Sequence, residues 1–230
     1  MSNILEVNNL RTSFFTKKGE VQAVRNVSFK VGRKEIVGLV GESGSGKSIT
    51  SKSIMGLISH PGKIVDGEIL FEGKDLAKLD EKEMRKIRGN EISIVFQDPM
   101  TALNPLIKVG KQISEILIRH QNLSKNEARE KAIELLKMVG IPSPEVRVDN
   151  YPHEFSGGMR QRVCIAMAMS SSPRLLIADE PTTALDVTIQ AQILRLIKKL
   201  NSENENSTIL ITHDLGVVYN TCDKVIVMYG

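Results

Sequence analysis

The sequence predicts an α/β fold in which a mostly parallel β-sheet carries helices on both faces. Residues 175–178 form a continuous apolar run, which is typical of a parallel strand covered on both sides. Apolar residues at helical spacing follow over 189–200, and another β-rich run follows over 208–212. Strand, helix and strand in this order favour a parallel sheet. Ligands of such sheets bind at the carboxyl ends of the strands, so the candidate functional residues should follow the apolar runs.

The composition is that of an ordinary globular protein. Of the 230 residues, 41% are hydrophobic and 25% are charged, which excludes a disordered chain, a collagen and a coiled coil. The lack of Trp and the 4% aromatic content disfavour a surface on which nucleic-acid bases stack. The net charge is only +4, and the basic residues are scattered along the chain. We therefore expect no nucleic-acid partner.

Cysteine usage and hydropathy indicate a reducing, cytosolic compartment. The two cysteines, Cys164 and Cys222, are unclustered, which excludes a zinc site and disfavours a disulfide scaffold. Cys164 lies in an apolar run and is predicted to be a core residue. No signal peptide is expected, and no apolar run is long enough to span a bilayer. Any role at a membrane must therefore come through a partner.

The first third of the chain predicts short strands over 4–10, 21–31 and 35–40, and a further strand at 68–71 between turn signals. A helix is expected from about residue 46 to 58, opening directly from the strand that ends at residue 40.

The middle of the chain, residues 107–171, has a helical pattern, which we interpret as an insertion within the α/β domain. Ser124 and Glu127 fit a capping box at the start of one helix, and Gly140 and Pro142 end that helix. A polar loop is then predicted at 201–207, followed by strands at 208–212 and 224–229.

A glycine-rich segment between a predicted strand and a predicted helix matches the phosphate-loop pattern G-x-x-x-x-G-K-[ST]. Its glycines let the backbone N–H groups point into one concavity, which with the helix N-terminus holds phosphates. Lys47 should reach the β- and γ-phosphates of a nucleotide, and the Ser48 hydroxyl should ligate Mg²⁺. The predicted ATP-binding residues are Gly41, Glu42, Ser43, Gly44, Ser45, Gly46, Lys47, Ser48 and Ile49.

Two adjacent carboxylates, Asp179 and Glu180, end the apolar run at 175–178. Two charges at the end of a buried strand are costly unless a cation or a reaction uses them. Asp179 is predicted to organise Mg²⁺, and Glu180 to act as the general base that activates the attacking water.

A second candidate anion site precedes another helix. Ser156 is an N-cap type of residue, and Gly157 and Gly158 allow close backbone approach. Because the phosphate loop already cradles the nucleotide of its own chain, this site suggests that a second chain grips the γ-phosphate. Taken alone, the Ser-Gly-Gly pattern is more typical of a plain N-cap.

The phosphate loop, the Ser156-Gly157-Gly158 signature and the Asp179-Glu180 pair occur in this order, and His213 follows the strand at 208–212. With these features the chain resembles the nucleotide-binding subunit of an ABC transporter, which is a P-loop NTPase. The resemblance covers essentially the whole chain. The resemblance implies an ATP-binding core at 1–102 and 173–230 with an N-terminal antiparallel β subdomain. It also implies a helical subdomain at 103–172 that carries the signature residues, and a head-to-tail dimer that encloses two ATP molecules.

Further roles are implied by the resemblance alone. Gln97 is expected to contact Mg²⁺ and the attacking water, and His213 to contact the γ-phosphate. Asp186, in the segment that begins at Ala184, is expected at the dimer interface. The expected catalytic residues are thus Glu180, His213, Gln97 and Lys47. The expected metal ligands are Ser48, Gln97 and Asp179. The signature residues expected to act on the other chain are Ser156, Gly157, Gly158 and Met159.

The chain departs from the usual family pattern at two signature positions and in the aromatic residue that stacks on adenine. Phe155 and Met159 stand where the usual signature has Leu and Gln. Phe14 is the candidate for stacking on adenine, with Phe15 and a purely structural role for either ring as alternatives.

The segments FSGGMRQR and FQDPMTALNP resemble the bacterial dipeptide, oligopeptide and nickel importer branch, most closely its first ATPase subunit. That branch implies a second ATPase chain, two membrane permease subunits, an extracellular solute-binding protein and a location on the cytoplasmic face of the cell membrane. It also leads us to expect that this chain lacks a C-terminal extension of the branch.

Two other function classes stay open at this stage. A non-transport ATPase of the same superfamily, acting in DNA repair or translation, would carry zinc modules, long coiled coils or tandem cassettes, which the sequence lacks. A chain that binds ATP but hydrolyses it only with its partner is the other alternative. The transported solute, a peptide or nickel, never touches this subunit and is not encoded in it.

Overall fold

The computed structural model describes residues 3–183 and 185–229, and its centre is a five-stranded parallel sheet. The strand order is β6-β7-β8-β3-β9, and every neighbouring pair is parallel. The strands are β6 (Ile92–Val95), β7 (Leu175–Asp179), β8 (Ser207–Thr212), β3 (Ile36–Gly41) and β9 (Lys224–Met228). The predicted α/β fold class is confirmed.

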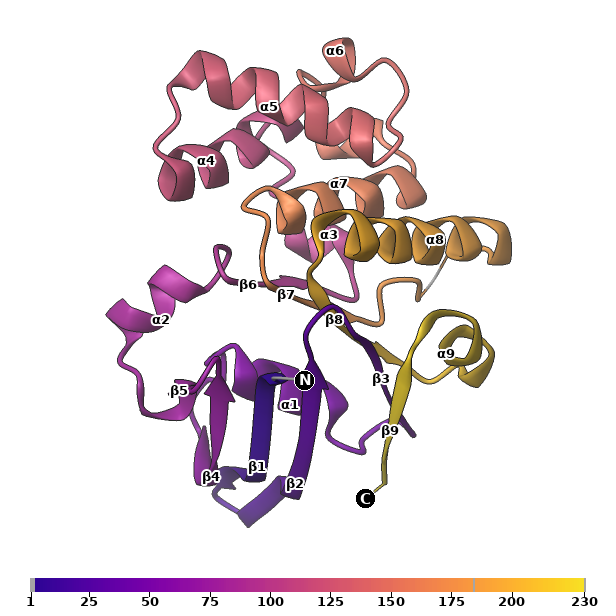
Figure 1. The fold of residues 1–230 in the computed structure, drawn as a ribbon. Coiled ribbons are helices and arrows are strands. Elements are labelled where there is room, and N and C mark those ends of the chain that lie inside the picture. The colour runs from indigo at the N-terminus through magenta and orange to yellow at the C-terminus, as the bar shows by residue number, and fades with distance from the viewer. Residues whose placement is uncertain (1–2, 184, 230) are drawn as a thin grey trace.

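A second, antiparallel sheet lies beside the first, with the order β2-β1-β4-β5 (Figure 1). It consists of β1 (Asn3–Thr16), β2 (Gly19–Gly32), β4 (Gly62–Phe71) and the short β5 (Lys74–Asp75). β1 runs well past the predicted end at residue 10 because Thr12 and Ser13 are buried and paired on both sides of the strand. Because these buried residues are polar, the alternation of apolar residues that predicts a strand does not extend to this part of β1.

Two hydrophobic cores lie on the two faces of the parallel sheet. Leu176 and Ala178 of β7 point to the core formed with the helical layer, whereas Leu175 and Ile177 point to the core formed with the antiparallel sheet. This alternation within one strand explains its continuous apolar sequence, since both faces are covered. In Figure 1 the helices α7 and α8 lie on one side of the sheet, and α1 lies on the other side.

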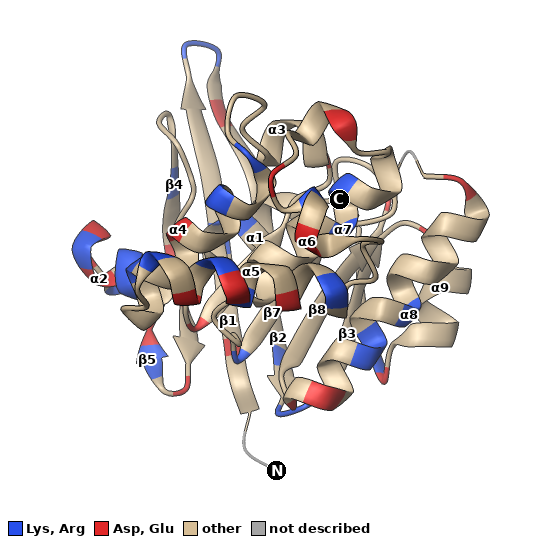
Figure 2. Ribbon diagram, turned by 90° about the horizontal axis from the view of Figure 1, so that it is seen from above, with Lys and Arg blue, Asp and Glu red and all other residues tan. Residues whose placement is uncertain are grey.

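The helical region contains α4 (Val109–Gln121), α5 (Lys125–Met138), the short α6 (Pro144–Arg147) and α7 (Gly157–Met169). The predicted capping box at the start of α5 is confirmed, with Ser124 and Glu127 bonded reciprocally. Acidic and basic residues are interspersed along α5 (Figure 2). Cys164 is a buried core residue as predicted, and burial raises the pKa of its thiol to about 12. The subdomain boundaries at 103 and 172 stay a prediction.

The remaining helices are α1 (Lys47–Ile54), α2 (Glu81–Ile87), α3 (Pro99–Ala102), α8 (Val187–Asn204) and α9 (Leu215–Thr221), with single 3₁₀ turns at Leu76–Lys78 and Pro152–Glu154. Among the described helices, none combines the length and apolar character that crossing a bilayer requires.

Two sequence predictions about helix ends are wrong. α1 ends at Ile54 rather than near residue 58, because Gly56 takes a left-handed φ of +61° that turns the chain. The predicted loop at 201–207 is mostly helix, since α8 continues to Asn204. The Asn201 amide is buried there and donates to the Asn206 carbonyl and to Thr208 Oγ1, so a polar residue does not mark a loop at this point.

Candidate functional site

The phosphate loop connects β3 to α1 through a tight backbone turn. Gly46, the N-cap residue of α1, has a φ of +91°, and a Cβ atom there would lie 2.5 Å from the Ala23 carbonyl oxygen. Only glycine fits both constraints. Because Gly46 has no side chain to cap the helix, the first N–H groups of α1 stay available to an anion.

The Lys47 side chain is folded back over this loop and is 5% exposed. Its ammonium group donates hydrogen bonds to the carbonyl oxygens of Gly41 and Glu42, each at 2.7 Å. These neutral acceptors leave the positive charge of Lys47 unpaired within the loop. A buried cation beside the start of a helix favours the binding of a phosphate.

Asp179, the last residue of β7, is buried against α1. It accepts hydrogen bonds from Ser48 Oγ at 3.0 Å and from Ser51 Oγ at 3.4 Å. Burial raises the pKa of Asp179 above its ordinary value, although the Ser48 hydrogen bond opposes this effect. Sequence reasoning missed Ser51, whose spacing of three residues from Ser48 on the same helix face could have revealed it.

The side chains around Asp179 suit a Mg²⁺ ion that is only partly coordinated by protein, rather than a metal ion that protein ligands coordinate completely. Within residues 3–183 and 185–229, no group of three or more His, Cys, Asp or Glu side chains could hold a metal ion. A serine hydroxyl and a single carboxylate are the ligands of a Mg²⁺ ion that keeps water molecules and binds substrate phosphates.

Glu180 lies where β6, β7 and β8 end. Its backbone has a φ of +47°, and its N–H donates to the Ile211 carbonyl of β8 at 3.0 Å. Glu180 Oε2 accepts from Gln97 Nε2 at 3.0 Å and from Thr183 Oγ1 at 2.9 Å. His213 Nδ1 is 3.6 Å from Glu180 Oε1. The three strand ends thus bring the predicted residues Gln97, Glu180 and His213 together, and they add Thr183, which the sequence did not single out.

The signature residues lie at the start of α7, on the opposite face of the sheet from α1 (Figure 1). Ser156 caps α7, because its Oγ accepts from the Met159 N–H at 3.4 Å. Gly158 permits a close contact with α8, since a Cβ atom there would lie 2.6 Å from Ile189 Cγ2. Within one chain these residues are therefore not part of the cluster around Lys47 and Glu180.

The two departures from the usual signature have structural explanations. Phe155 is 4% exposed and belongs to the core of the helical layer, and the Arg147 guanidinium lies 5.8 Å from its ring centre. Met159 is half-buried and packs against the same core.

Asp186 is exposed and caps α8, accepting from the Ile189 N–H at 2.9 Å. Its predicted role at a dimer interface stays a prediction, and Ala184 in the same segment lies outside the described residues.

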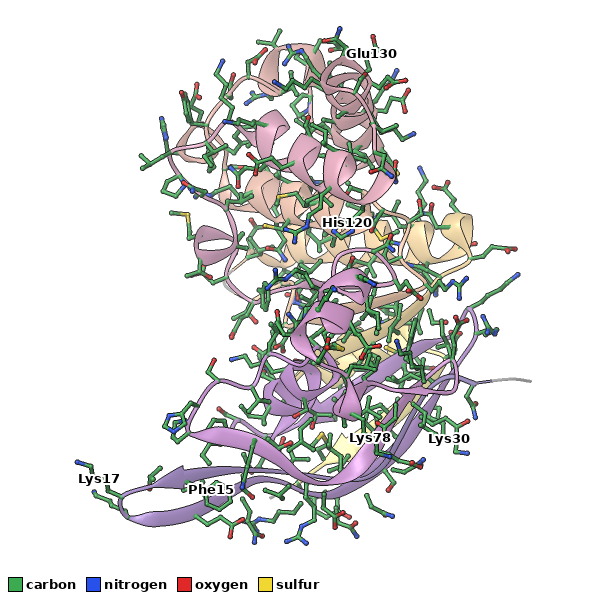
Figure 3. The ribbon with its side chains drawn as sticks, turned by 90° about the vertical axis from the view of Figure 1, so that its left-hand side faces the viewer. Phe15, Lys17, Lys30, Lys78, His120 and Glu130 are labelled. Atoms are coloured by element: carbon green, nitrogen blue, oxygen red, sulfur yellow. The ribbon has the colours of Figure 1, made fainter. Side chains whose placement is uncertain are left out.

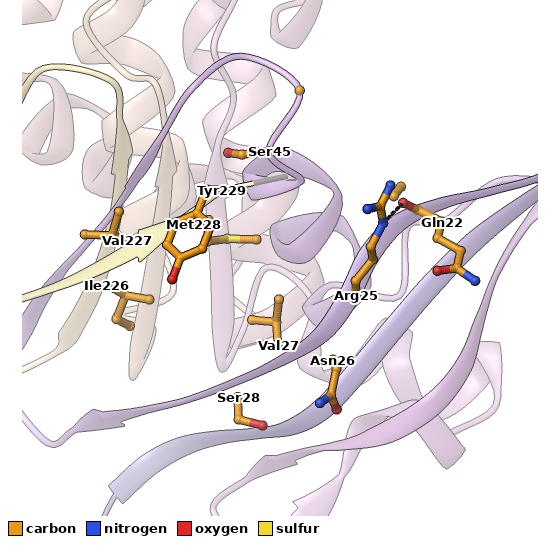
Figure 4. Close-up of a pocket in the computed structure, with 12 residues that line it drawn as sticks. Gln22, Arg25, Asn26, Val27, Ser28, Ser45, Ile226, Val227, Met228 and Tyr229 are labelled. Atoms are coloured by element: carbon orange, nitrogen blue, oxygen red, sulfur yellow. Dashed lines mark hydrogen bonds between the residues drawn. The ribbon is translucent and has the colours of Figure 1, made fainter.

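A cavity of about 320 Å³ lies beside the phosphate loop at Gly44 and Ser45 (Figure 4). Its other walls come from residues 22–28 of β2 and from the end of β9, and Arg25 Nε donates to the Gln22 carbonyl at 3.4 Å. Ser45 Oγ is buried and has no hydrogen-bond partner among the described residues.

The described residues that line this cavity include neither candidate aromatic ring. Phe14 is half-buried, and its ring occupies the space beside Gly62. Phe15 is 43% exposed near Lys17 at the tip of the β1–β2 ribbon, with Lys63 Nζ 4.7 Å from its ring centre (Figure 3). Adenine stacking by Phe14 stays a prediction.

Comparisons with known proteins agree with this geometry. A family model described as "ABC transporter" matches residues 24–183. The chain is 61% identical to the oligopeptide transport ATP-binding protein OppD of Bacillus subtilis, with all of this chain and 64% of OppD aligned. It is 58% identical to the dipeptide transport ATP-binding protein DppD of the same organism, covering 69% of that protein. The chain thus spans about two thirds of the length of these relatives.

The fold is also similar to solved structures of ATP-binding cassettes. A dimeric, post-hydrolysis ATP-binding cassette, MJ0796, bound to ADP and Pi, superposes with a TM-score of 0.87 at 31% identity, covering 97% of this chain and 94% of the cassette.

Proposed function

This chain belongs to the ABC transporter family, and on that basis we propose that it is the ATP-hydrolysing subunit of a bacterial peptide importer. The observation that carries the proposal is the cluster at the strand ends, in which Asp179 contacts the phosphate-loop helix and Glu180 contacts Gln97 and His213. The names of its relatives, which are oligopeptide and dipeptide transport proteins, support peptides over nickel as the solute class.

In this proposal, the N–H groups at the start of α1 and the Lys47 ammonium bind the β- and γ-phosphates of ATP, along residues Gly41 to Ile49. Ser48, Asp179 and Gln97 would hold Mg²⁺, which when bound neutralises charge on the phosphate oxygens. Lys47 then exchanges its two backbone carbonyl acceptors for phosphate oxygens, which are charged and therefore stronger acceptors.

Glu180 is the proposed general base. Its carboxylate accepts a proton from water as the water oxygen bonds to the γ-phosphorus, and the bond to the leaving ADP oxygen breaks. His213 lies beside the carboxylate at the end of β8, where it would contact the γ-phosphate.

The position of the signature residues supports a dimer. Because α7 and α1 lie on opposite faces of the sheet, Ser156, Gly157 and Gly158 would complete a nucleotide site only in a second ATPase chain, identical or different. Asp186 would lie at that interface, and Phe14 would stack on adenine.

Two membrane permease subunits, fed by an extracellular solute-binding protein, are the further proposed partners, which puts the chain on the cytoplasmic face of the membrane. A largely apolar groove of about 330 Å³ supports their attachment. Leu57 and Phe96 line it and are each 36% exposed, and Phe96 directly precedes Gln97. His120, on the α4 wall of the groove, is labelled in Figure 3.

ATP hydrolysis measured over a range of chain concentrations tests the proposal. A specific rate that rises steeply with concentration indicates a self-dimer, and a rate that appears only with a second ATPase subunit indicates a heterodimer. A chain that neither binds Mg-ATP nor hydrolyses it in either assembly contradicts the proposal.

A further inference from the structure

We propose that Thr183 is a positioning residue for Glu180, and that it leaves Glu180 Oε1 as the oxygen that takes the proton from water. This inference rests on the proposed function, because it concerns the same carboxylate. It adds a residue and an atomic assignment that the phosphate-loop, signature and strand-end motifs do not contain.

The two oxygens of the carboxylate have different surroundings. Oε2 accepts two hydrogen bonds, from Thr183 Oγ1 at 2.9 Å and from Gln97 Nε2 at 3.0 Å. A carboxylate oxygen has about two lone-pair sites, so these two donors saturate Oε2. Among the residues that the structure describes, the group beside Oε1 is His213, whose Nδ1 at 3.6 Å is beyond a normal hydrogen bond. The free lone pairs of the carboxylate are therefore those of Oε1.

The local backbone explains why a positioning group is needed. Glu180 has a φ of +47°, a conformation that costs free energy outside glycine and that the surrounding structure must enforce. The Thr183 N–H donates to the Glu180 carbonyl at 3.2 Å, which closes a turn. Thr183 thus bonds both the backbone and the side chain of Glu180, so that one turn determines where the carboxylate points.

Gln97 is a less constrained donor to the carboxylate than Thr183. It follows the end of β6, is exposed, and is the residue proposed to turn its amide toward Mg²⁺. An amide has its acceptor oxygen and its donor nitrogen on different sides, so Gln97 can offer its oxygen to the ion while Nε2 still donates to Glu180 Oε2. Thr183 lies on the same short turn as Glu180 and does not take part in metal binding, so its hydroxyl can keep Oε2 occupied during proton transfer.

The proposed step is then defined at each atom. The water O–H bond breaks as the proton bonds to Oε1, while the water oxygen bonds to the γ-phosphorus and ADP leaves. Thr183 Oγ1–H donates to Oε2 before and after the step and exchanges no proton.

Thr183→Val, which removes the hydroxyl but keeps the shape, is the test. We expect kcat for ATP hydrolysis to fall about tenfold, because small misplacements of a reacting group are costly. KM for ATP and the dissociation constant for ATP should stay within about twofold. Thr183→Ser should recover most of the lost kcat, since it restores the hydroxyl. Thr16→Val, at a threonine on the distant β1–β2 turn, is the matched control.

A second comparison uses Glu180→Gln as background. If Thr183 acts through the carboxylate, adding Thr183→Val to Glu180→Gln should not lower the single-turnover rate further. An equal loss in both backgrounds, an unchanged kcat in Thr183→Val, or a failure of Thr183→Ser to recover activity would each overturn the positioning role. If Glu180→Gln itself leaves turnover unchanged, the proposed base is wrong, which is a separate failure.

Discussion

The Ser48 hydroxyl donates a hydrogen bond to Asp179 Oδ1 across 3.0 Å, although 131 residues separate the two in the chain. The contact joins the helix that follows the phosphate loop to the end of a central strand. It brings a hydroxyl and a carboxylate, both suited to Mg²⁺, to one point. The carboxylate is 5% exposed, and burial raises its pKa, so the site holds a charge at a cost to stability.

Asp179→Asn should therefore stabilise the nucleotide-free protein. The asparagine can still accept from Ser48 but carries no charge to bury, and a gain of about 1 kcal/mol would raise the Tm by roughly 2–4 °C. The same variant should lose the additional stabilisation that Mg²⁺ gives to the ATP-bound protein. Thermal unfolding with ATP, with and without Mg²⁺, measures both effects, and Asp66→Asn at an exposed aspartate is the control. A lower Tm in the nucleotide-free Asn variant would contradict this account of Asp179.

The same carboxylate predicts a pH dependence. Since the folded state holds the Asp179 proton more tightly than the unfolded state, stability should fall as the pH rises from the ordinary value of 3.8 toward the raised pKa. Asp179→Asn should lack this component. Unfolding free energies of the wild type and of Asp179→Asn are measured across this acidic range. The difference between the two free energies should widen with rising pH and then level off. A difference that does not change with pH contradicts the assignment.

Lys47→Ala should weaken ATP binding about 10- to 100-fold. The expected loss is that of a hydrogen bond to a charged group, about 1.5–3 kcal/mol. Fluorescent-nucleotide titration measures it, with Lys86→Ala, an exposed lysine on α2, as the control. Wild-type affinity in Lys47→Ala would contradict the assignment of residues 41–49 as the ATP site.

The two signature glycines should respond differently to alanine. A Cβ at Gly158 would lie 2.6 Å from Ile189 Cγ2, so Gly158→Ala should destabilise the fold by about 1–3 kcal/mol. A Cβ at Gly157 would meet only Leu185 Cδ2 at 3.7 Å, an ordinary contact. Gly157→Ala should therefore keep a normal Tm yet lose ATP-dependent dimerisation, measured by light scattering with a hydrolysis-deficient variant. Normal dimerisation of Gly157→Ala would contradict the role of the signature in a second chain.

The apolar groove beside Gln97 should affect assembly rather than ATP binding. Leu57→Glu adds a charge to the groove, so it should reduce co-purification with membrane subunits and leave ATP affinity unchanged. Leu106→Glu, at a residue 85% exposed and outside the residues that line this groove, is the matched control. Equal losses in the two variants would count against the groove as the attachment surface.

The parts of the site that depend on strand ends were predictable from the sequence, because parallel strands bring their carboxyl ends to one edge. Glu180 and His213 end strands that the sequence predicts, whereas Gln97 was expected from the family resemblance, and the structure brings the three together. Thr183 and Ser51 were not predicted, since a hydroxyl near a carboxylate depends on side-chain direction rather than on periodicity. The prediction of a loop at 201–207 was wrong for a related reason. The polarity of Asn201 suggested exposure, but this residue is buried and its side chain is hydrogen-bonded.

The role of Glu180 as the general base is tested by comparing ATP binding and ATP turnover in Glu180→Gln with those of the wild type. We expect the dissociation constant for Mg-ATP to stay near that of the wild type, while kcat falls by about 10²–10⁴-fold because the general base is lost. Undiminished turnover in Glu180→Gln, with ATP binding intact, would contradict the assignment of this carboxylate as the base.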